Sequence, residues 1–255
     1  MTSSQPTTPR SADLEAVILD YNGVIGRQPG PAQWTRLAEL AGWHSHETHA
    51  FQQAFWQRRK TYDQGITETQ AFWSGLLRNG RTAPAGSTLL AALGRADTDM
   101  WTATDPAVLD LLHTAHATGL RLVLLSNAPK PLANTLDDAE WCTTLFSRTV
   151  YSARIGVNKP HKRAYKAALE AAGMPHPSKT LFVDDRLDNV EAAEQLGLQA
   201  LHYTGDPAAL ARWLPRPPTV THSAAALTTS ACPPRDALPR ARHPPHPDDR
   251  IGDRP

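Results

Sequence analysis

Side chains that can bind a metal ion or a phosphate group follow three short apolar runs of this 255-residue chain. Asp20 follows the run AVIL, Ser126 and Asn127 follow LVLL, and Asp184 and Asp185 follow LFV. Continuous apolar runs are typical of strands buried on both faces, as in a parallel sheet. Because parallel strands end at the same edge of a sheet, we expect these side chains to converge.

Carboxylates gathered at one edge repel each other unless a cation compensates, and oxygen-only ligands favour a hard cation such as Mg²⁺. Lys159 could add a further positive charge. The pattern therefore suggests a Mg²⁺ site with a carboxylate nucleophile, an amine and a hydroxyl around an anionic substrate. Each acid taken alone could instead cap the helix that follows it, but capping poorly explains the four groups Asp20, Ser126-Asn127, Lys159 and Asp184-Asp185 in this order.

Two weaker apolar runs, at 149–151 and 200–203, complete a series of five predicted strands. Helical patterns separate them; Pro160 suits the first position of a helix through Ala172, which Gly173 would end. The alternation predicts an α/β fold, a doubly wound parallel-sheet (Rossmann-like) core assigned to 14–25 and 104–214.

Residues 26–103 differ from the rest of the chain. They hold five of the seven tryptophans and no convincing strand, which predicts an all-helical cap inserted directly after the first strand. An insert at that point can cover a site at the carboxyl ends of the strands. Residues 1–13 and the tail 215–255, which contains ten of the 22 prolines and no aromatic residue, are predicted to be disordered.

Composition excludes several classes of protein. Lys+Arg 26 against Asp+Glu 25 leaves a formal charge of +1, without the basic excess expected of a nucleic-acid or membrane-surface protein. Two cysteines, Cys142 and Cys232, are too few for a disulfide scaffold. With no spanning run and no secretory pattern, we expect a cytoplasmic protein that binds neither nucleic acid nor membrane. The sequence does not predict an oligomeric state.

The segments LDYNGVIG, LLSNAP, NKP and FVDDRLDNVEAAEQLGL, in this order, resemble the four motifs of the haloacid dehalogenase-like (HAD) hydrolases. The resemblance covers roughly residues 14–203, and the insert falls where that superfamily carries its small helical cap. It implies a phosphatase for a small phosphorylated metabolite. Asp20 would attack phosphorus and form an aspartyl-phosphate, Ser126 would hydrogen-bond a phosphoryl oxygen with Asn127 steadying the loop, and Lys159 would balance charge.

The resemblance also implies a Mg²⁺ cofactor held by Asp20, a backbone carbonyl at Asn22, and the paired acids. Asp185 would be the direct ligand and Asp184 its close or water-mediated companion. One position departs from the family pattern: its phosphatases usually carry a second Asp, the general acid and base, where this chain has Asn22. An amide cannot exchange a proton at neutral pH.

That departure leaves alternatives open. A non-catalytic member that binds a phosphorylated ligand or partner would also tolerate Asn22. A 2-haloacid dehalogenase lacks the second Asp as well, but dehalogenases generally replace the paired metal acids that Asp184 and Asp185 retain here.

Three other groups have ordinary structural explanations. We expect the histidines at 44, 46 and 49 to be exposed or packed rather than metal-bound, and Arg58-Arg59-Lys60 to be a solvated helix end rather than a phosphate contact. Trp34, Trp56 and Trp73 are interpreted as core of the insert.

Overall fold

The computed structural model describes residues 13–78, 83–84 and 86–215. The termini predicted to be disordered, 1–13 and 215–255, lie outside the described residues except for Asp13 and Pro215.

Five parallel strands form one sheet in the order β3-β2-β1-β4-β5. They are β1 (Ala16–Leu19), β2 (Arg121–Ser126), β3 (Arg148–Tyr151), β4 (Thr180–Asp184) and β5 (Gln199–His202). Leu19 lies opposite Leu124 of β2 and Val183 of β4, so the ends of the three central strands are in register. The predicted α/β doubly wound core is confirmed, with all five strands at the predicted places.

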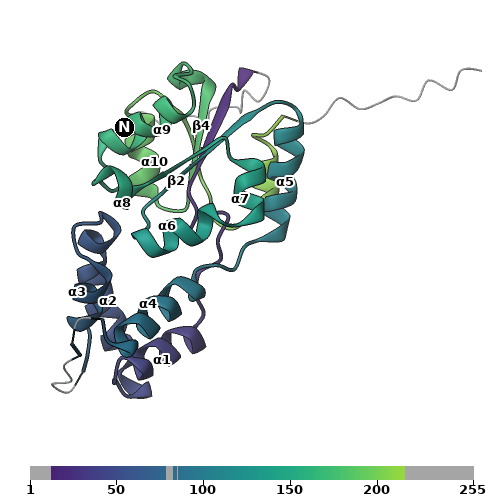
Figure 1. The fold of residues 1–255 in the computed structure, drawn as a ribbon. Helices are drawn as coiled ribbons and strands as arrows, with labels where there is room; N and C mark the ends of the chain where they lie inside the picture. Colours follow the sequence, from purple (N-terminus) through teal and green to yellow (C-terminus); the bar gives the residue numbers. More distant parts are fainter. Residues whose placement is uncertain (1–12, 79–82, 85, 216–255) are drawn as a thin grey trace, which may run out of the picture. The chain divides into compact units, whose positions relative to one another are not determined.

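Helices cover both faces of this sheet (Figure 1). One face packs on α9 (Lys162–Ala171) and α10 (Leu187–Glu194), and the other on α5 (Pro106–Ala117), α7 (Glu140–Leu145) and α11 (Pro207–Ala211). Side chains of β1 alternate between the two cores, with Ile18 in one and Leu19 in the other. Two further helices, α6 (Lys130–Asp137) and α8 (Ser152–Ile155), follow β2 and β3.

The chain between β1 and α5 is helical throughout its regular elements, as predicted. It forms α1 (Pro31–Leu40), a short 3₁₀ turn η2 (Ser45–Glu47), α2 (Thr48–Asp63), α3 (Thr69–Ser74) and α4 (Thr88–Met100). We call these elements the helical insert. Its two connections run side by side, because the Arg27 backbone N–H donates to Ala103 and that of Asp105 donates to Ile25. A second 3₁₀ turn, η3 (Pro177–Lys179), precedes β4.

The three tryptophans assigned to the core of the insert differ in burial. Trp34 and Trp73 are buried, as predicted, and Trp34 meets the ring of Phe55 edge-on with centroids 5.1 Å apart. Trp56 is 51% exposed, so its assignment to the core of the insert was wrong. Within the described ranges, no helix is both long and apolar enough to cross a membrane.

Candidate active site

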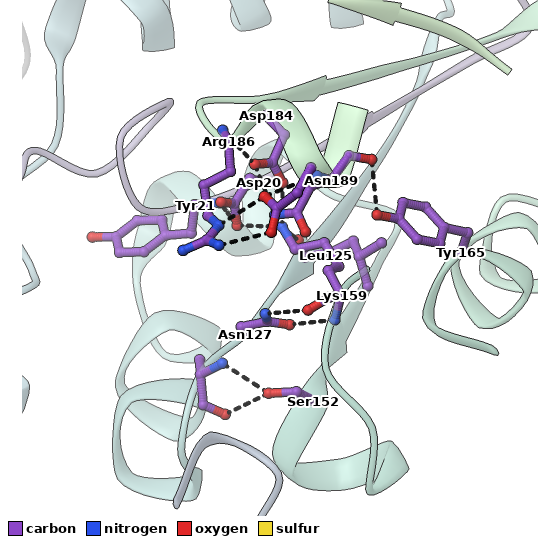
Figure 2. Close-up of polar contacts among 12 residues, drawn as sticks. Asp20, Tyr21, Leu125, Asn127, Ser152, Lys159, Tyr165, Asp184, Arg186 and Asn189 are labelled. Carbon is purple, nitrogen blue, oxygen red and sulfur yellow. Dashed lines mark hydrogen bonds and ion pairs between the residues drawn. The ribbon is translucent and has the colours of Figure 1, made fainter. Parts of the chain in front are cut away.

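The carboxylates of Asp20 and Asp184, at the ends of two neighbouring strands, come together at the carboxyl edge of the sheet (Figure 2). Lys159 lies at their centre, with its Nζ 2.7 Å from Asp20 Oδ1 and 2.7 Å from Asp184 Oδ2. The same ammonium donates to the carbonyl of Leu125 at 2.9 Å. Asp20, Lys159 and Asp184 are all buried, so this cation offsets carboxylates that water does not screen.

Asn127 holds the backbone of Lys159 from the end of β2. Its Oδ1 accepts from the Lys159 backbone N–H at 2.8 Å, and its Nδ2 donates to the Lys159 carbonyl at 3.1 Å (Figure 2). This reciprocal pair fixes the loop that presents the ammonium.

Asp184 is fully buried and its Oδ1 is already occupied. That oxygen accepts from the Arg186 backbone N–H at 2.9 Å and from Asn189 Nδ2 at 3.0 Å. Asn189 is in turn fixed by the Tyr165 hydroxyl, which donates to its carbonyl at 2.9 Å. The sequence motif contains Asn189, but nothing in the residue pattern alone assigns it this contact with Asp184.

Three carboxylates fit a hard divalent cation. Asp20, Asp184 and Asp185 each offer an oxygen, and these oxygens all lie within 4.8 Å of one another. Asp185 packs its carboxylate against Gly23, where a Cβ would overlap the Asp185 side chain and where φ is +81°. Only glycine adopts this conformation without strain and leaves room for the Asp185 carboxylate. Gly23 therefore helps to fix the position of that side chain. The all-oxygen donor set matches the Mg²⁺ preference.

Burial controls the protonation of this cluster. It raises the pKa of Asp20 to about 7, against the attraction of Lys159, and Asp184 adds to the rise. Burial and Asp184 likewise raise the pKa of Asp185. Burial alone would lower the pKa of Lys159, but Asp184 and Asp20 raise it overall, so the amine stays protonated.

A cavity of about 310 Å³ opens over these residues. The sheet edge and its loops contribute Asp20, Asn22, Asn127, Lys159, Asp185, Arg186 and Asn189. The helical insert and its connections contribute Gln28, Trp56, Arg59, Asp63 and Trp101. Two predicted site residues, Ser126 and Asp184, are buried and do not line it. The Ser126 hydroxyl and Asn22 Oδ1 have no hydrogen-bond partner within the described part of the chain.

Arg58 and Lys60 are exposed, as predicted for a solvated helix end, but the prediction was wrong for Arg59. It is 4% exposed, its Nε donates to Asp63 Oδ1 at 2.7 Å, and its Nη1 donates to Asp97 of α4 at 3.0 Å. Trp101 Nε1 also donates to Asp97 at 3.0 Å. The i,i+4 spacing of Arg59 and Asp63 on a predicted helix is the sequence signal that would have identified the pair.

The sequence of residues 14–197 matches the model of the haloacid dehalogenase-like hydrolase family. The chain belongs to this family, as its motifs suggested.

Individual relatives are phosphatases by name. A phosphatase of Mycobacterium tuberculosis is 30% identical over 192 residues, which cover 73% of this chain and 86% of that protein. A sesquiterpene phosphatase of Aspergillus oryzae is 31% identical over 100 residues, which cover 39% of this chain and only 50% of that protein.

A solved structure shares the fold. The HAD family enzyme of Bacteroides thetaiotaomicron, solved in complex with magnesium and inorganic phosphate, superposes with a TM-score of 0.58 at 19% identity. The superposition covers 76% of this chain and 96% of that enzyme. At this identity the similarity shows the fold alone.

Proposed function

We propose that this protein is a Mg²⁺-dependent phosphatase that hydrolyses a small phosphorylated metabolite in a cytoplasmic setting, with Asp20 as nucleophile. The observation that carries the proposal is the ammonium of Lys159, held 2.7 Å from both Asp20 and Asp184 beside an open cavity. The family and the named phosphatase relatives support the same reaction.

The chain's own groups match the demands of phosphoryl transfer, which depends on positioning and on charge stabilisation. Asp20 Oδ1 accepts from the Tyr21 backbone N–H and from Lys159. Its Oδ2 accepts no hydrogen bond within the described ranges and is the oxygen that we expect to attack phosphorus. Lys159 would balance the charge of the transferring group. Ser126 would donate its unpartnered hydroxyl to a phosphoryl oxygen after a side-chain rotation, because it does not line the cavity in this structure.

Asp20 and Asp185 would hold the metal directly, and the backbone carbonyl of Asn22 would complete the protein's share of the ligands. Asp184, whose oxygens already bind Lys159, Arg186 and Asn189, fits a position beside the metal rather than on it. When bound, Mg²⁺ supplies charge neutralisation for the phosphoryl oxygens. Asn127 would keep Lys159 in place.

Asn22 favours a second candidate function, the binding of a phosphorylated ligand or partner without turnover. An amide at this position neither protonates the leaving group nor deprotonates the attacking water. Dehalogenation is less well supported, because the paired acids Asp184 and Asp185 remain and lie together with Asp20.

Hydrolysis of 4-nitrophenyl phosphate with and without Mg²⁺ tests the proposal. This ester has a good leaving group and makes little demand on the missing acid. Mg²⁺-dependent turnover by the wild type that is lost in Asp20→Asn supports the phosphatase. Mg²⁺-dependent capture of beryllium fluoride without turnover supports the binding function instead.

A further inference from the structure

Each cationic side chain that lines the cavity in the described ranges is paired with one or two carboxylates. Arg59 binds Asp63 and Asp97, and Lys159 binds Asp20 and Asp184. The third cation, Arg186, lies at the exposed rim.

Arg186 is paired as well, because its Nε and Nη2 donate to Asp188 at 3.1 and 2.8 Å. With Asp185 included, three cations face six carboxylates in and directly behind the cavity wall. One divalent cation would offset part of this excess of negative charge and neutralise charge on the phosphoryl group. Within the described part of the chain, neither buried cation of the wall, Arg59 or Lys159, is free to bind a second anionic group of the substrate, and burying an unpaired anion is strongly unfavourable.

The insert side of the cavity offers an acceptor instead. Asp63 is 8% exposed and lines the cavity, and its Oδ1 is taken by Arg59. Its Oδ2 accepts no hydrogen bond within the described part of the chain and is not fully buried, so a donor in the cavity can reach it. A ligand donor at this point would satisfy it.

An apolar wall lies next to this acceptor. Trp56 and Trp101 both line the cavity, with ring centroids 6.0 Å apart and planes inclined by 70°. Trp56, 51% exposed, presents indole surface that no other side chain covers fully, and such surface is available to an apolar ligand group.

We infer that the cavity takes phosphate monoesters whose phosphoryl group is their only anion, with the alcohol part packed on Trp56 and a hydroxyl or ammonium donating to Asp63 Oδ2. The inference rests on the proposed function for the position of the phosphoryl group, at Asp20 and Lys159. It assigns Asp63 as a specificity-determining residue and disfavours bisphosphates and phosphorylated carboxylic acids.

Binding of unreactive phosphonates tests the inference separately from turnover. Four benzylphosphonates, unsubstituted or carrying a para aminomethyl, hydroxymethyl or carboxymethyl group, differ only at the end remote from phosphorus. Their Kd values are measured by calorimetry with saturating Mg²⁺ at pH 8, above the value of about 7 to which burial raises the pKa of Asp63. We expect the aminomethyl and hydroxymethyl compounds to bind about tenfold more tightly than the carboxymethyl one, the effect of one charge-assisted hydrogen bond.

Asp63→Asn should remove the advantage of the aminomethyl compound, whereas Glu68→Gln, which changes an exposed carboxylate of the insert, should retain the wild-type order. Equal or tighter binding of the carboxymethyl compound by the wild type, or no binding of any of the four, overturns the inference. If Asp63→Asn does not fold, the wild-type order alone decides. The expected order without hydrolysis of phenyl phosphate would support the ligand class and contradict the phosphatase.

Discussion

Lys159 is the residue on which the electrostatics of the site depend. It is buried and bridges two buried carboxylates, whereas Lys179 forms a single ion pair with Glu15 at the exposed start of the sheet. Removing one partner of a buried ion pair leaves an uncompensated charge, which costs about 3–5 kcal/mol. An exposed pair contributes little because water and salt screen it.

We therefore predict that Lys159→Met lowers the free energy of unfolding by about 3 kcal/mol or more and abolishes phosphatase activity. Urea denaturation followed by circular dichroism measures the first effect and 4-nitrophenyl phosphate hydrolysis the second. Lys179→Met is the matched control and should change neither by much. Wild-type stability and rate in Lys159→Met would remove Lys159 from the centre of the site.

Because position 22 is Asn22, the site lacks a general acid and base at this position. A positioned acid or base contributes typically about 10²–10⁴ in rate. We predict that Asn22→Asp raises kcat/KM, which reports formation of the aspartyl-phosphate, more for alkyl phosphates, whose alkoxides are poor leaving groups, than for 4-nitrophenyl phosphate. Steady-state kinetics on a matched ester series measures the ratio. An equal effect on all esters would show that Asp at this position does not act as the acid.

At the scale of elements, the Arg59 network joins α2 to α4 inside the insert. Arg59 and Asp63 lie one helical turn apart on α2, and Asp97 lies on α4. Two carboxylates share one buried guanidinium, and burial raises the pKa of Asp63 to about 7 despite the attraction of Arg59. The folded protein therefore retains a proton at this site over a pH range in which the unfolded chain has lost it.

This shift gives a prediction with a definite sign. Between about pH 4 and 7 the folded state binds the Asp63 proton more tightly than the unfolded state, so stability falls as pH rises through this range. We predict that the wild type loses more thermal stability between pH 5 and 8 than Asp63→Asn does. Asp99→Asn, which changes an exposed carboxylate of α4, should keep the wild-type pH dependence. Equal pH dependence in wild type and Asp63→Asn would mean that Asp63 titrates normally.

The elements and the sheet-edge residues follow from the sequence, but the insert side of the cavity does not. Apolar runs ending in Asp20, Ser126 and Asp184 predict their positions because a parallel sheet collects strand ends at one edge. The approach of Asp63 and Trp56 to the sheet-edge residues depends instead on packing between segments far apart in the chain. Burial of Arg59 was missed because a cluster of basic residues is usually solvated, and only its partner on α4 explains the exception.

At the scale of the described molecule, several contacts hold the insert against the core. The Ser152 hydroxyl donates to the carbonyl of Asp63, and Asn158 Nδ2 donates to the carbonyl of Lys60 at 3.0 Å. Gly65 lies so close to the backbone of Ala153 that a Cβ would be 2.6 Å from its carbonyl oxygen. These contacts place the C-terminal end of α2 beside the site and let the insert form one wall of the cavity.

Metal binding should stabilise the folded molecule as a whole. A ligand that binds only the folded state adds about 2.7 kcal/mol at a concentration of 100 Kd. We predict that Mg²⁺ raises the Tm of the wild type and not that of Asp185→Asn, because Asp185 is the open carboxylate of the cluster. Asp188→Asn, a change to an exposed acid nearby, should retain the response. A Tm that does not respond to Mg²⁺ in the wild type would contradict the proposed metal site.

Pre-steady-state hydrolysis of 4-nitrophenyl phosphate with Mg²⁺ tests Asp20 as nucleophile most directly. The first step needs little acid assistance with this leaving group. Hydrolysis of the aspartyl-phosphate needs a base to activate water, and Asn22 does not supply one. We predict a burst of nitrophenolate close to one equivalent per site, followed by slow turnover, and no release by Asp20→Asn. Hydrolysis by Asp20→Asn at the wild-type rate would contradict nucleophilic catalysis by Asp20.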